Sequence, residues 1–267
     1  MSADGPVVLL TGASAGIGAA TASLLASRGF RVFGTSRRRP ADPGGTTWIP
    51  MDVCDEAQVR DGVARVLAEA GRIDALVCNA GYGIFGSVEE TGLPRVRAQL
   101  ETNVFGTLNP VRAVLPHLRA RGGGRIVLVG SLAGRTAIPF QTHYSMTKAA
   151  VASLAAGLAI EAAPFGVRVV LVEPGDIKTA FNDATDWGDT SASAYGERLR
   201  SCERVIRESL EKAPGPEVVA RVILRALTAR RPRRRYPVGP DSWLVPVLGR
   251  LLPDAITSAL VRRHFAV

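Results

Sequence analysis

The stretch VVLLTGASAGIG, from Val7 to Gly18, decides the fold of this chain. Its first four residues form a short apolar run, and the following residues are mostly small. A buried strand that leads at once through a glycine-rich turn into a helix is the arrangement with which α/β sheets bind phosphates. Gly12 allows a tight turn, Gly16 lets the backbone approach a pyrophosphate, and Gly18 lets the helix pack close to the sheet. The residues expected to bind a dinucleotide here are Gly12, Ser14, Gly16, Ile17 and Gly18.

Apolar, valine-rich runs alternate with longer helical stretches along the rest of the chain. Nearly continuous runs such as 125–129 and 167–172 are typical of parallel strands buried on both faces. The alternation of strands and helices predicts a doubly wound α/β fold with right-handed crossovers. The predicted strands are 6–10, 30–35, 46–51, 73–78, 124–130, 167–173 and 235–238, and the predicted helices are 16–28, 55–70, 94–120, 142–165 and 197–230.

The composition fits one globular domain, residues 1–267, with 46% hydrophobic and 21% charged residues. No apolar run reaches the ~18 residues of a membrane span, and the N-terminus lacks the pattern of a secretory signal. We therefore expect a cytoplasmic protein. Neither the three cysteines, Cys54, Cys78 and Cys202, nor the three histidines, His117, His143 and His264, have the spacing of a metal site, so we expect no metal.

The chain is basic, with a net charge of +9 and a pI of about 10.3. Its densest basic run is Arg230–Arg235, which lies just before the last predicted strand. No aromatic platform or recognition-helix pattern accompanies this run, as readout of bases requires. We expect a solvated turn and no nucleic-acid partner, with binding to an anionic surface as the alternative.

The end of the second predicted strand carries no acid. It reads Gly34-Thr35-Ser36-Arg37-Arg38, whereas dinucleotide folds that prefer NAD usually place an acid there, bonded to the ribose hydroxyls. Ser36 and Arg37 can instead hold a 2′-phosphate, because guanidinium pairs well with phosphate oxygens. The sequence therefore predicts NADP rather than NAD; the alternative is that these arginines are plain surface charge.

Tyr144 and Lys148 are four residues apart on a predicted helix, so they lie on one face of it. An ammonium beside a phenol favours the phenolate, because a nearby positive charge lowers the pKa of an acid. The pair is typical of a general acid/base tuned toward neutral pH. The spacing alone arises often by chance, and its significance comes from the glycine-rich turn that precedes it.

Further motifs follow the predicted strands in order. Asp52-Val53 follows the third strand and can contact an adenine ring, and Asn79-Ala80-Gly81 follows the fourth, where Asn79 can bridge strand ends or simply form a turn. Ser131 follows the fifth strand and Pro174-Gly175 the sixth. Together with the glycine turn and Tyr144-x-x-x-Lys148, these motifs resemble the short-chain dehydrogenase/reductase family from residue 7 to about residue 180.

The resemblance implies a single Rossmann-type domain with a seven-stranded parallel sheet flanked by helices, and binding of NAD or NADP. Tyr144 resembles the family acid/base that exchanges a proton with the substrate oxygen. Lys148 resembles the lysine that holds the nicotinamide ribose and lowers the tyrosine pKa. Ser131 is similar to the hydroxyl that polarises the substrate oxygen, and Asn103 to the helix asparagine that supports a water and lysine proton relay. Taken alone, Ser131 could be a helix cap and Asn103 an ordinary polar helix residue.

The segment 174–179 is similar to the family segment whose Ile and Thr hold the nicotinamide amide, here Ile177 and Thr179. The nicotinamide supplies the hydride, and the protein supplies placement and charge. Outside the glycine turn, the expected cofactor-binding residues are Ser36, Arg37, Asp52, Val53, Asn79, Ala80, Gly81, Tyr144, Lys148, Pro174, Gly175, Ile177 and Thr179.

The region 178–212 usually builds the substrate side in this family, and we expect it to form a mobile lid. The residues expected to line a mostly apolar pocket are Tyr82, Ile138, Phe140, Phe181, Trp187 and Tyr195. The C-terminal extension 240–267 is amphipathic and contains Pro246 and Pro253. We expect it to form helical pieces docked on the domain, with a membrane-surface helix as the alternative.

Segments 34–37 and 173–179 and the long tail look similar to hydroxysteroid and retinol dehydrogenase-like members of the family. We therefore expect an NADP-dependent oxidoreductase for a bulky apolar ketone, aldehyde or alcohol that is steroid-like, lipid-like or polyketide-like. The alternative is a non-catalytic NADP-binding sensor or scaffold of the same fold. Because helices 94–120 and 142–165 commonly pair two subunits in the family, we also expect a homodimer.

Overall fold

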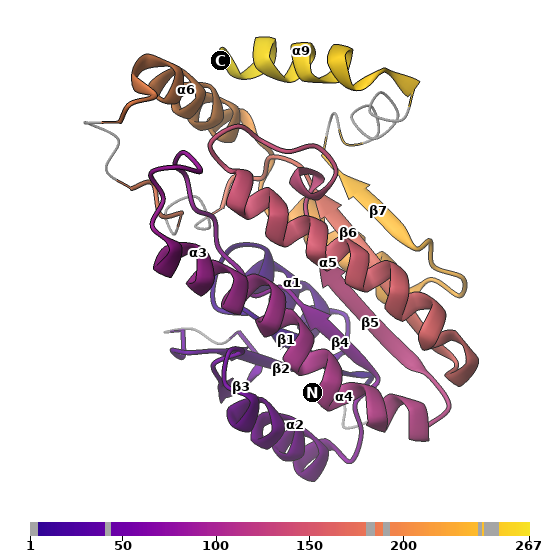
Figure 1. The fold of residues 1–267 in the computed structure, drawn as a ribbon. Helices are drawn as coiled ribbons and strands as arrows, with labels where there is room; N and C mark the ends of the chain where they lie inside the picture. The colour runs from indigo at the N-terminus through magenta and orange to yellow at the C-terminus, as the bar shows by residue number, and fades with distance from the viewer. Residues whose placement is uncertain (1–4, 41–43, 180–184, 189–192, 240–241, 243–250) are drawn as a thin grey trace.

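A computed structural model of the chain describes residues 5–40, 44–179, 185–188, 193–239, 242 and 251–267 (Figure 1). Seven parallel strands form one sheet in the order β3-β2-β1-β4-β5-β6-β7. The strands are β1 (Val7–Thr11), β2 (Arg31–Ser36), β3 (Thr47–Pro50), β4 (Ala75–Cys78), β5 (Gly124–Val129), β6 (Val167–Pro174) and β7 (Arg235–Val238). The predicted doubly wound α/β fold with a seven-stranded parallel sheet is therefore confirmed.

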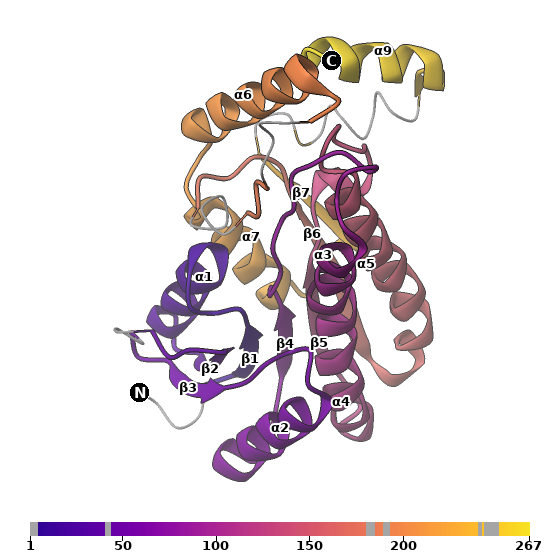
Figure 2. The ribbon, with the colours of Figure 1, turned by 60° about the vertical axis from the view of Figure 1, so that its left-hand side comes forward.

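Helices cover both faces of the sheet (Figure 2). The helices are α1 (Gly16–Ser27), α2 (Glu56–Ala70), α3 (Leu93–Leu100), α4 (Gly106–Ala120), α5 (Thr142–Glu161), α6 (Gly196–Lys212), α7 (Glu217–Thr228) and α9 (Asp254–Phe265). The apolar sides of α1 and α7 pack on one face, where Leu25 and Ile223 are fully buried. Those of α2, α4 and α5 pack on the other, where Val66, Val114 and Val151 are buried. The strands are buried from both sides, which explains their continuous apolar sequence.

Two predicted helices are interrupted. The helix expected over 197–230 is two helices, because Pro214 and Pro216 lie between α6 and α7 and proline cannot donate the backbone hydrogen bond that a continuous helix needs. The helix expected over 94–120 contains a π-helical turn, η1 (Glu101–Phe105), between α3 and α4. Such turns widen a helix locally and occur frequently at functional sites.

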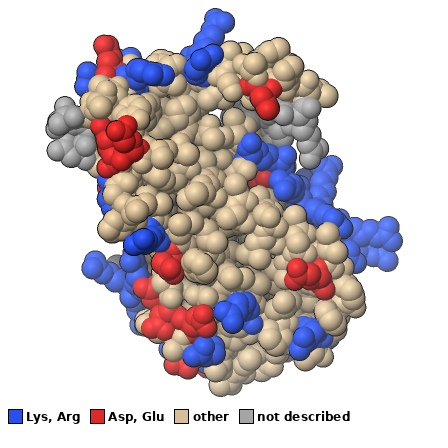
Figure 3. All heavy atoms as spheres, in the orientation of Figure 1, with Lys and Arg blue, Asp and Glu red and all other residues tan. Residues whose placement is uncertain are grey.

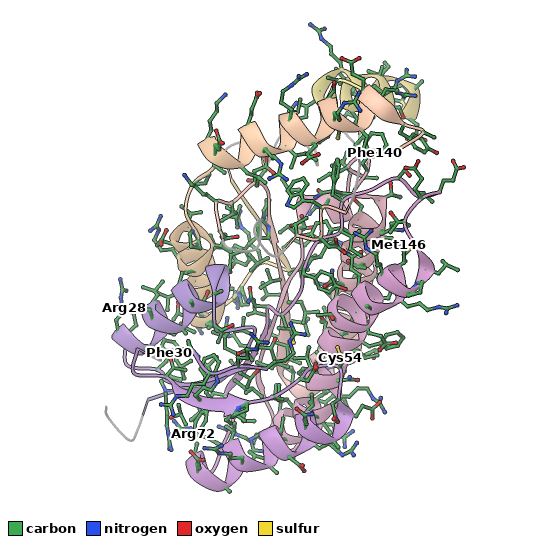
Figure 4. All side chains as sticks on the ribbon, turned by 90° about the vertical axis from the view of Figure 1, so that its left-hand side faces the viewer. Arg28, Phe30, Cys54, Arg72, Phe140 and Met146 are labelled. Atoms are coloured by element: carbon green, nitrogen blue, oxygen red, sulfur yellow. The ribbon has the colours of Figure 1, made fainter. Side chains whose placement is uncertain are left out.

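The last two described helices, α6 and α9, lie together beyond the carboxyl ends of the strands (Figure 1). Phe265 of α9 and Val267 pack on a small apolar cluster that includes Cys202 and Ile206 of α6. Phe140, which precedes α5, reaches toward α6 from below (Figure 4). The end of the tail is thus docked on the rest of the chain, as expected, while 243–250 lie outside the described residues. Within the described part, every helix is too short or too polar to cross a lipid bilayer.

A buried ion cluster ties three segments together at the end of β6. The Glu173 side chain is fully buried and accepts hydrogen bonds from Arg135 Nε at 2.8 Å and Nη2 at 2.5 Å. It also accepts one from Arg235 Nη1 at 3.0 Å. Arg135 ends the turn that follows β5, and Arg235 begins β7. Glu173 therefore fixes the β5 turn and β7 against the end of β6.

Replacing this carboxylate should destabilise the fold. In Glu173→Gln, the largely buried Arg135 guanidinium loses its counter-charge, and breaking a buried pair in this way typically costs about 3–5 kcal/mol. Arg235 is 37% exposed, so solvent screens its loss and it adds little. We expect a correspondingly lower midpoint of urea-induced unfolding, followed by circular dichroism. Glu56→Gln is the matched control, because the carboxylate of Glu56 pairs with Arg60 and Arg112 at the surface, where ion pairs contribute little. Equal midpoints for the two variants would contradict the structural role of Glu173.

Candidate active site

A cavity of about 1850 Å³ opens at the carboxyl ends of the strands. Its position follows from the strand order, because the chain moves outward from β1 to β3 and then returns to place β4 on the other side of β1. Loops diverge at such a switch point, and ligands of doubly wound sheets bind there. The volume exceeds the roughly 300–1,000 Å³ of a site for one small molecule. It therefore has room for a dinucleotide and a substrate together.

The glycine turn forms one end of the cavity and tolerates no larger residue. Gly12 has φ +65°, and a Cβ atom on it would lie 2.8 Å from the Ala80 Cα. A Cβ on Gly18 would lie 2.0 Å from the Gly12 carbonyl oxygen. Gly16, with φ +52°, begins α1, whose Ncap Ala15 provides no side-chain hydrogen bond to the first turn. The free N–H groups of that turn and the helix dipole suit a phosphate, so the turn fits a dinucleotide.

Asn79 links the ends of β1 and β4. Its Nδ2 donates to the carbonyl oxygens of Thr11 at 3.3 Å and Gly12 at 3.0 Å, and its backbone N–H donates to Thr11 Oγ1 at 3.1 Å. Ala80 N also donates to Thr11 Oγ1, at 3.3 Å. The sequence left open whether Asn79 bridges strand ends or only forms a turn, and these hydrogen bonds show that it bridges the strand ends.

Basic side chains form the wall beyond β2. Ser36, Arg37, Arg38 and Arg39 line the cavity, and the three arginines are exposed. No ion pair joins these arginines to an acid among the described residues. Asp52, across the cavity after β3, accepts a hydrogen bond from Cys54 N at 2.9 Å. This wall fits the negatively charged half of a dinucleotide better than it fits a neutral ligand.

Ser131, Tyr144 and Lys148 line the same cavity from the turn after β5 and from α5. The Lys148 Nζ lies 5.7 Å from the centroid of the Tyr144 ring and donates to the Val129 carbonyl oxygen at 3.0 Å. Ser131 caps the short helix η2 (Leu132–Gly134) by accepting from Ala133 N, and its hydroxyl also hydrogen bonds with the phenol of Tyr144. Ser131 is therefore the helix cap that the sequence allowed, and its expected contact with the substrate oxygen stays a prediction.

Burial dominates the protonation of this group. Desolvation raises the pKa of Tyr144 to about 12, against the lowering effect of the Ser131 hydrogen bond, and the charge of Asp176 raises it further. Desolvation lowers the pKa of Lys148 to about 8. The expectation that Lys148 holds the Tyr144 pKa below its usual value is therefore wrong for this structure. The ammonium is turned toward the Val129 carbonyl, and its own charge is disfavoured by burial.

Asn103 lies behind the cavity wall, in the π-helical turn. Its side chain is fully buried. The Oδ1 atom accepts from Tyr82 N at 3.0 Å, and Nδ2 donates to the Tyr82 carbonyl at 2.9 Å and to Thr147 Oγ1 at 3.0 Å. These bonds hold the segment after β4 against α5 near Lys148. Its hydrogen bonds within the described part of the chain do not include one to Lys148, so the expected proton relay stays a prediction.

The segment after β6 closes the cavity over the glycine turn. Gly175 N donates to the Val238 carbonyl at 2.8 Å, and Lys178 N donates to the Pro214 carbonyl at 2.9 Å. These bonds bring Thr179 so close to Gly16 that a Cβ on Gly16 would lie 3.2 Å from the Thr179 Cβ. The structure thus gathers almost all predicted site residues around one cavity. The residues that line it are Gly12, Ser14, Gly16, Ile17, Ser36, Arg37, Asp52, Val53, Asn79, Ala80, Gly81, Ser131, Tyr144, Lys148, Pro174, Gly175, Ile177 and Thr179, whereas Gly18 and Asn103 lie behind its walls.

The other half of the cavity is mostly apolar. Tyr82, Ile138 and Trp187 line it as predicted, under a roof that includes Ile206 of α6 and Val261 of α9. The prediction was wrong for two aromatic residues that do not line it. Phe140 and Tyr195 pack edge to face with ring centroids 5.8 Å apart, and Phe140 lies 6.1 Å from the buried ring of Phe85. The two rings pack against the apolar cluster beneath α6. Phe181, which was also predicted to line the pocket, lies outside the described residues.

Asp176 is a cavity residue that the sequence analysis passed over. The sequence signal that could have pointed to Asp176 is the presence of an acid in segment 174–179, which was expected to contact the cofactor. Conversely, the basic run Arg230–Arg235 takes no part in the cavity. It lies in the connection from α7 to β7, where basic side chains gather at the right edge of the molecule (Figure 3).

The expectation of no metal site concerns the scattered histidine and cysteine side chains. No group of three or more His, Cys, Asp or Glu residues that could hold a metal ion occurs in the part of the chain that the structure describes. The side chains that gather at the cavity include a phenol, an amine and a hydroxyl, beside a space with room for a dinucleotide. This arrangement can exchange a proton with an oxygen of a bound molecule.

Comparison with known proteins identifies the family of the chain. Residues 6–188 match the family model described as short chain dehydrogenase. The chain is 34% identical over 267 residues to 3-ketodihydrosphingosine reductase of Bacteroides thetaiotaomicron, covering 98% of both chains. It is 36% identical over 255 residues to 17-beta-hydroxysteroid dehydrogenase type 1 of Homo sapiens, covering 86% of this chain and 76% of that one. A short-chain dehydrogenase from Streptomyces avermitilis has a crystal structure that superposes with a TM-score of 0.84 at 35% identity, covering 98% of this chain and 97% of that one.

The matched region contains the glycine turn, the strand-end motifs and the Ser131, Tyr144 and Lys148 group, in one cavity. Family model, relatives and solved structure all cover most of the described sheet. The chain belongs to the short chain dehydrogenase family, and it is an oxidoreductase that acts with a nicotinamide cofactor on a keto or hydroxyl group.

Proposed function

We propose that the protein interconverts a ketone or aldehyde and the corresponding alcohol with NADP(H), on a bulky apolar substrate. The observation that carries the proposal is the shared cavity, which runs from the glycine turn, past Ser131, Tyr144 and Lys148, to the apolar roof of α6 and α9. A sensor or scaffold protein has no need for a buried acid at the junction between the cofactor space and a second, apolar space.

In this proposal Tyr144, Ser131 and Lys148 each have a separate role. Tyr144 donates its proton to the carbonyl oxygen during reduction and takes one from the alcohol during oxidation. Ser131, which already hydrogen bonds with the phenol, holds the substrate oxygen in place. Lys148 binds the ribose next to the nicotinamide. The bound nicotinamide supplies or accepts the hydride, and the raised pKa of Tyr144 keeps the proton available for reduction.

The preference for NADP rests on the wall beyond β2. Three exposed arginines and Ser36 stand there, at the position where an acid would contact the ribose hydroxyls of NAD. A 2′-phosphate can form bidentate hydrogen bonds with a guanidinium at this wall. The proposal of an apolar substrate is supported by the apolar roof and by Ile138 and Trp187, which line the cavity. It is also supported by two relatives, which are named for a ketodihydrosphingosine and for hydroxysteroids.

We also propose that the protein is a homodimer. Large apolar side chains are exposed on one flank formed by η1 and α5, including Phe105 at 47%, Met146 at 45% and Ile160 at 65% exposure. Met146 lies on the outer side of α5 (Figure 4). A second copy would cover this apolar flank.

Tyr144→Phe should bind the cofactor and lose nearly all turnover, because the ring remains and only the transferable proton is gone. General acid catalysis typically contributes about 10²–10⁴-fold. The measurement is carbonyl reduction followed at the absorbance of the reduced nicotinamide, with cofactor affinity measured by calorimetry. Tyr236→Phe, in β7 and bonded to Arg233 N, is the control and should keep its turnover. A Tyr144→Phe enzyme with wild-type turnover would exclude this residue as the acid.

Arg37→Asp should shift the cofactor preference from NADPH toward NADH. The variant loses a charge-assisted contact and adds repulsion of the 2′-phosphate, so kcat/KM with NADPH should fall about 10- to 100-fold relative to NADH. Arg60→Asp changes the same charge on the exposed side of α2 and should leave the ratio unchanged. A wild type that prefers NADH would remove the argument for NADP.

A pair of arginines on the apolar flank should separate the subunits. We expect multi-angle light scattering to give the mass of two chains for the wild type and of one chain for the double variant Phe105→Arg, Met146→Arg. Val88→Arg alters an apolar residue that is 59% exposed and lies outside η1 and α5, and it should stay dimeric. A monomeric wild type would reject the dimer.

A further inference from the structure

Asp176 places an exposed carboxylate on the wall of the cavity. It follows Gly175 and precedes Ile177 at the end of β6, and it lines the same cavity as Ser131 and Tyr144. Its Oδ2 accepts a hydrogen bond of 2.6 Å from Ser209 Oγ. Ser209 belongs to α6, the first helix of the roof. The carboxylate is therefore held between the reacting end of the cavity and the apolar part.

Asp176 forms no salt bridge with a basic side chain within the described residues. Lys212 also lines the cavity, yet no ion pair among the described residues joins Asp176 to Lys212 or to Lys178. The charge is felt at the reacting group, because Asp176 adds to the rise in the Tyr144 pKa that burial causes. A negative charge close to the oxygen of a neutral ketone opposes the build-up of negative charge on that oxygen. For a purely apolar ketone, this residue is a disadvantage.

A positive charge on the substrate changes the sign of this effect. A protonated amine beside the carbonyl would pair with Asp176, and the charge-assisted hydrogen bond would orient the carbonyl toward Tyr144. The rest of such a molecule must be apolar, since Ile138, Trp187 and Val261 line the space beyond. An ammonium next to the reacting carbon and an apolar body therefore match the two halves of the substrate space.

We propose that Asp176 binds a protonated amine next to the reacting carbonyl, so that the substrate is an aminoketone with a long or bulky apolar body, or the matching amino alcohol. The inference rests on the proposed function, whose substrate class it narrows. In the reduction, the carbonyl carbon receives the hydride of the reduced nicotinamide and the oxygen receives the proton of Tyr144. The amine keeps its proton, and Asp176 stays ionised.

The test compares ketones that differ only at the amine. The probes are a long-chain 2-amino-3-ketone, the same ketone without the amine, and the same ketone with the amine acetylated and hence neutral. For the wild type with NADPH and with NADH, kcat/KM should be at least about 10-fold higher for the free amine than for either neutral probe. In Asp176→Asn, this preference should fall about 10- to 100-fold, because the amide keeps the shape but not the charge.

Two variants and one binding measurement distinguish recognition of the amine by Asp176 from a merely structural role of this residue. Ser209→Ala frees the carboxylate and should reduce the preference in part. Asp61→Asn removes an acid from the exposed face of α2, at the opposite end of the molecule from α9, and should preserve the preference (Figure 1). In calorimetry, the amino alcohol product should bind wild type more tightly than Asp176→Asn, and this difference should disappear for the acetylated product.

Each contrary result has its own meaning. If Asp176→Asn lowers kcat/KM equally for all three probes, the residue has only a structural role and the inference fails. It also fails if the preference survives the substitution. If Asp176→Asn changes only the relative affinity for oxidised and reduced cofactor, the carboxylate serves the positive nicotinamide ring and not the substrate. A wild type that reduces the neutral ketones equally well overturns the inference and leaves the proposed function standing, whereas no turnover of any ketone overturns both.

Discussion

The close approach of backbone at the ends of β1 and β4 is the constraint on which this structure depends. The Gly12 Cα faces the backbone of Ala80 without room for a Cβ, and the start of α1 packs on the Gly12 carbonyl at Gly18. The side-chain amide of Asn79 donates hydrogen bonds to the carbonyl oxygens of Thr11 and Gly12 at the same place. This contact sets where α1 begins relative to the sheet. It thereby creates both the phosphate-binding end of the cavity and the path along which the substrate space continues.

Burial gives the reacting residues their electrostatic character. The Tyr144 phenol and the Lys148 amine both lose solvation in the same wall, which favours the neutral form of each. The pKa of Tyr144 rises to about 12, and the pKa of Lys148 falls to about 8. In this state the phenol keeps its proton. The supporting contacts are placed at a distance from the chemistry: Asn103 joins the strand-end segment to α5, and Glu173 secures the turn that carries Ser131. Rigid surroundings of this kind hold reacting groups within the narrow range of geometry that catalysis needs.

The substrate half of the cavity has a different construction. Its walls come from the segment around Trp187, from α6 soon after it, and from α9 near the end of the chain, and α9 contains no buried residue. The aromatic residues Phe85, Phe140 and Tyr195 support α6 from below and leave the cavity surface to smaller apolar side chains. Two carboxylates, Asp176 and Glu208, interrupt this apolar lining, and the charge of Asp176 is the one that acts on the Tyr144 phenol. Selectivity in such a site comes from a few polar groups placed within a mostly apolar space.

The sequence by itself determined the sheet, the order of its elements and nearly all residues around the cofactor space, because local signals carry that information. Valine-rich runs mark buried strands, glycine marks positions without room for a Cβ, and Tyr144 and Lys148 share a helix face through their spacing alone. The break between α6 and α7 was also encoded locally, by Pro214 and Pro216. Tertiary structure alone decided the π-helical turn at Asn103, the inward packing of Phe140 and Tyr195, and the raised Tyr144 pKa. It also decided that Asp176 enters the cavity. These features depend on which distant segments meet and how far they exclude water, and no local pattern encodes the distance between two segments or the solvation of a side chain.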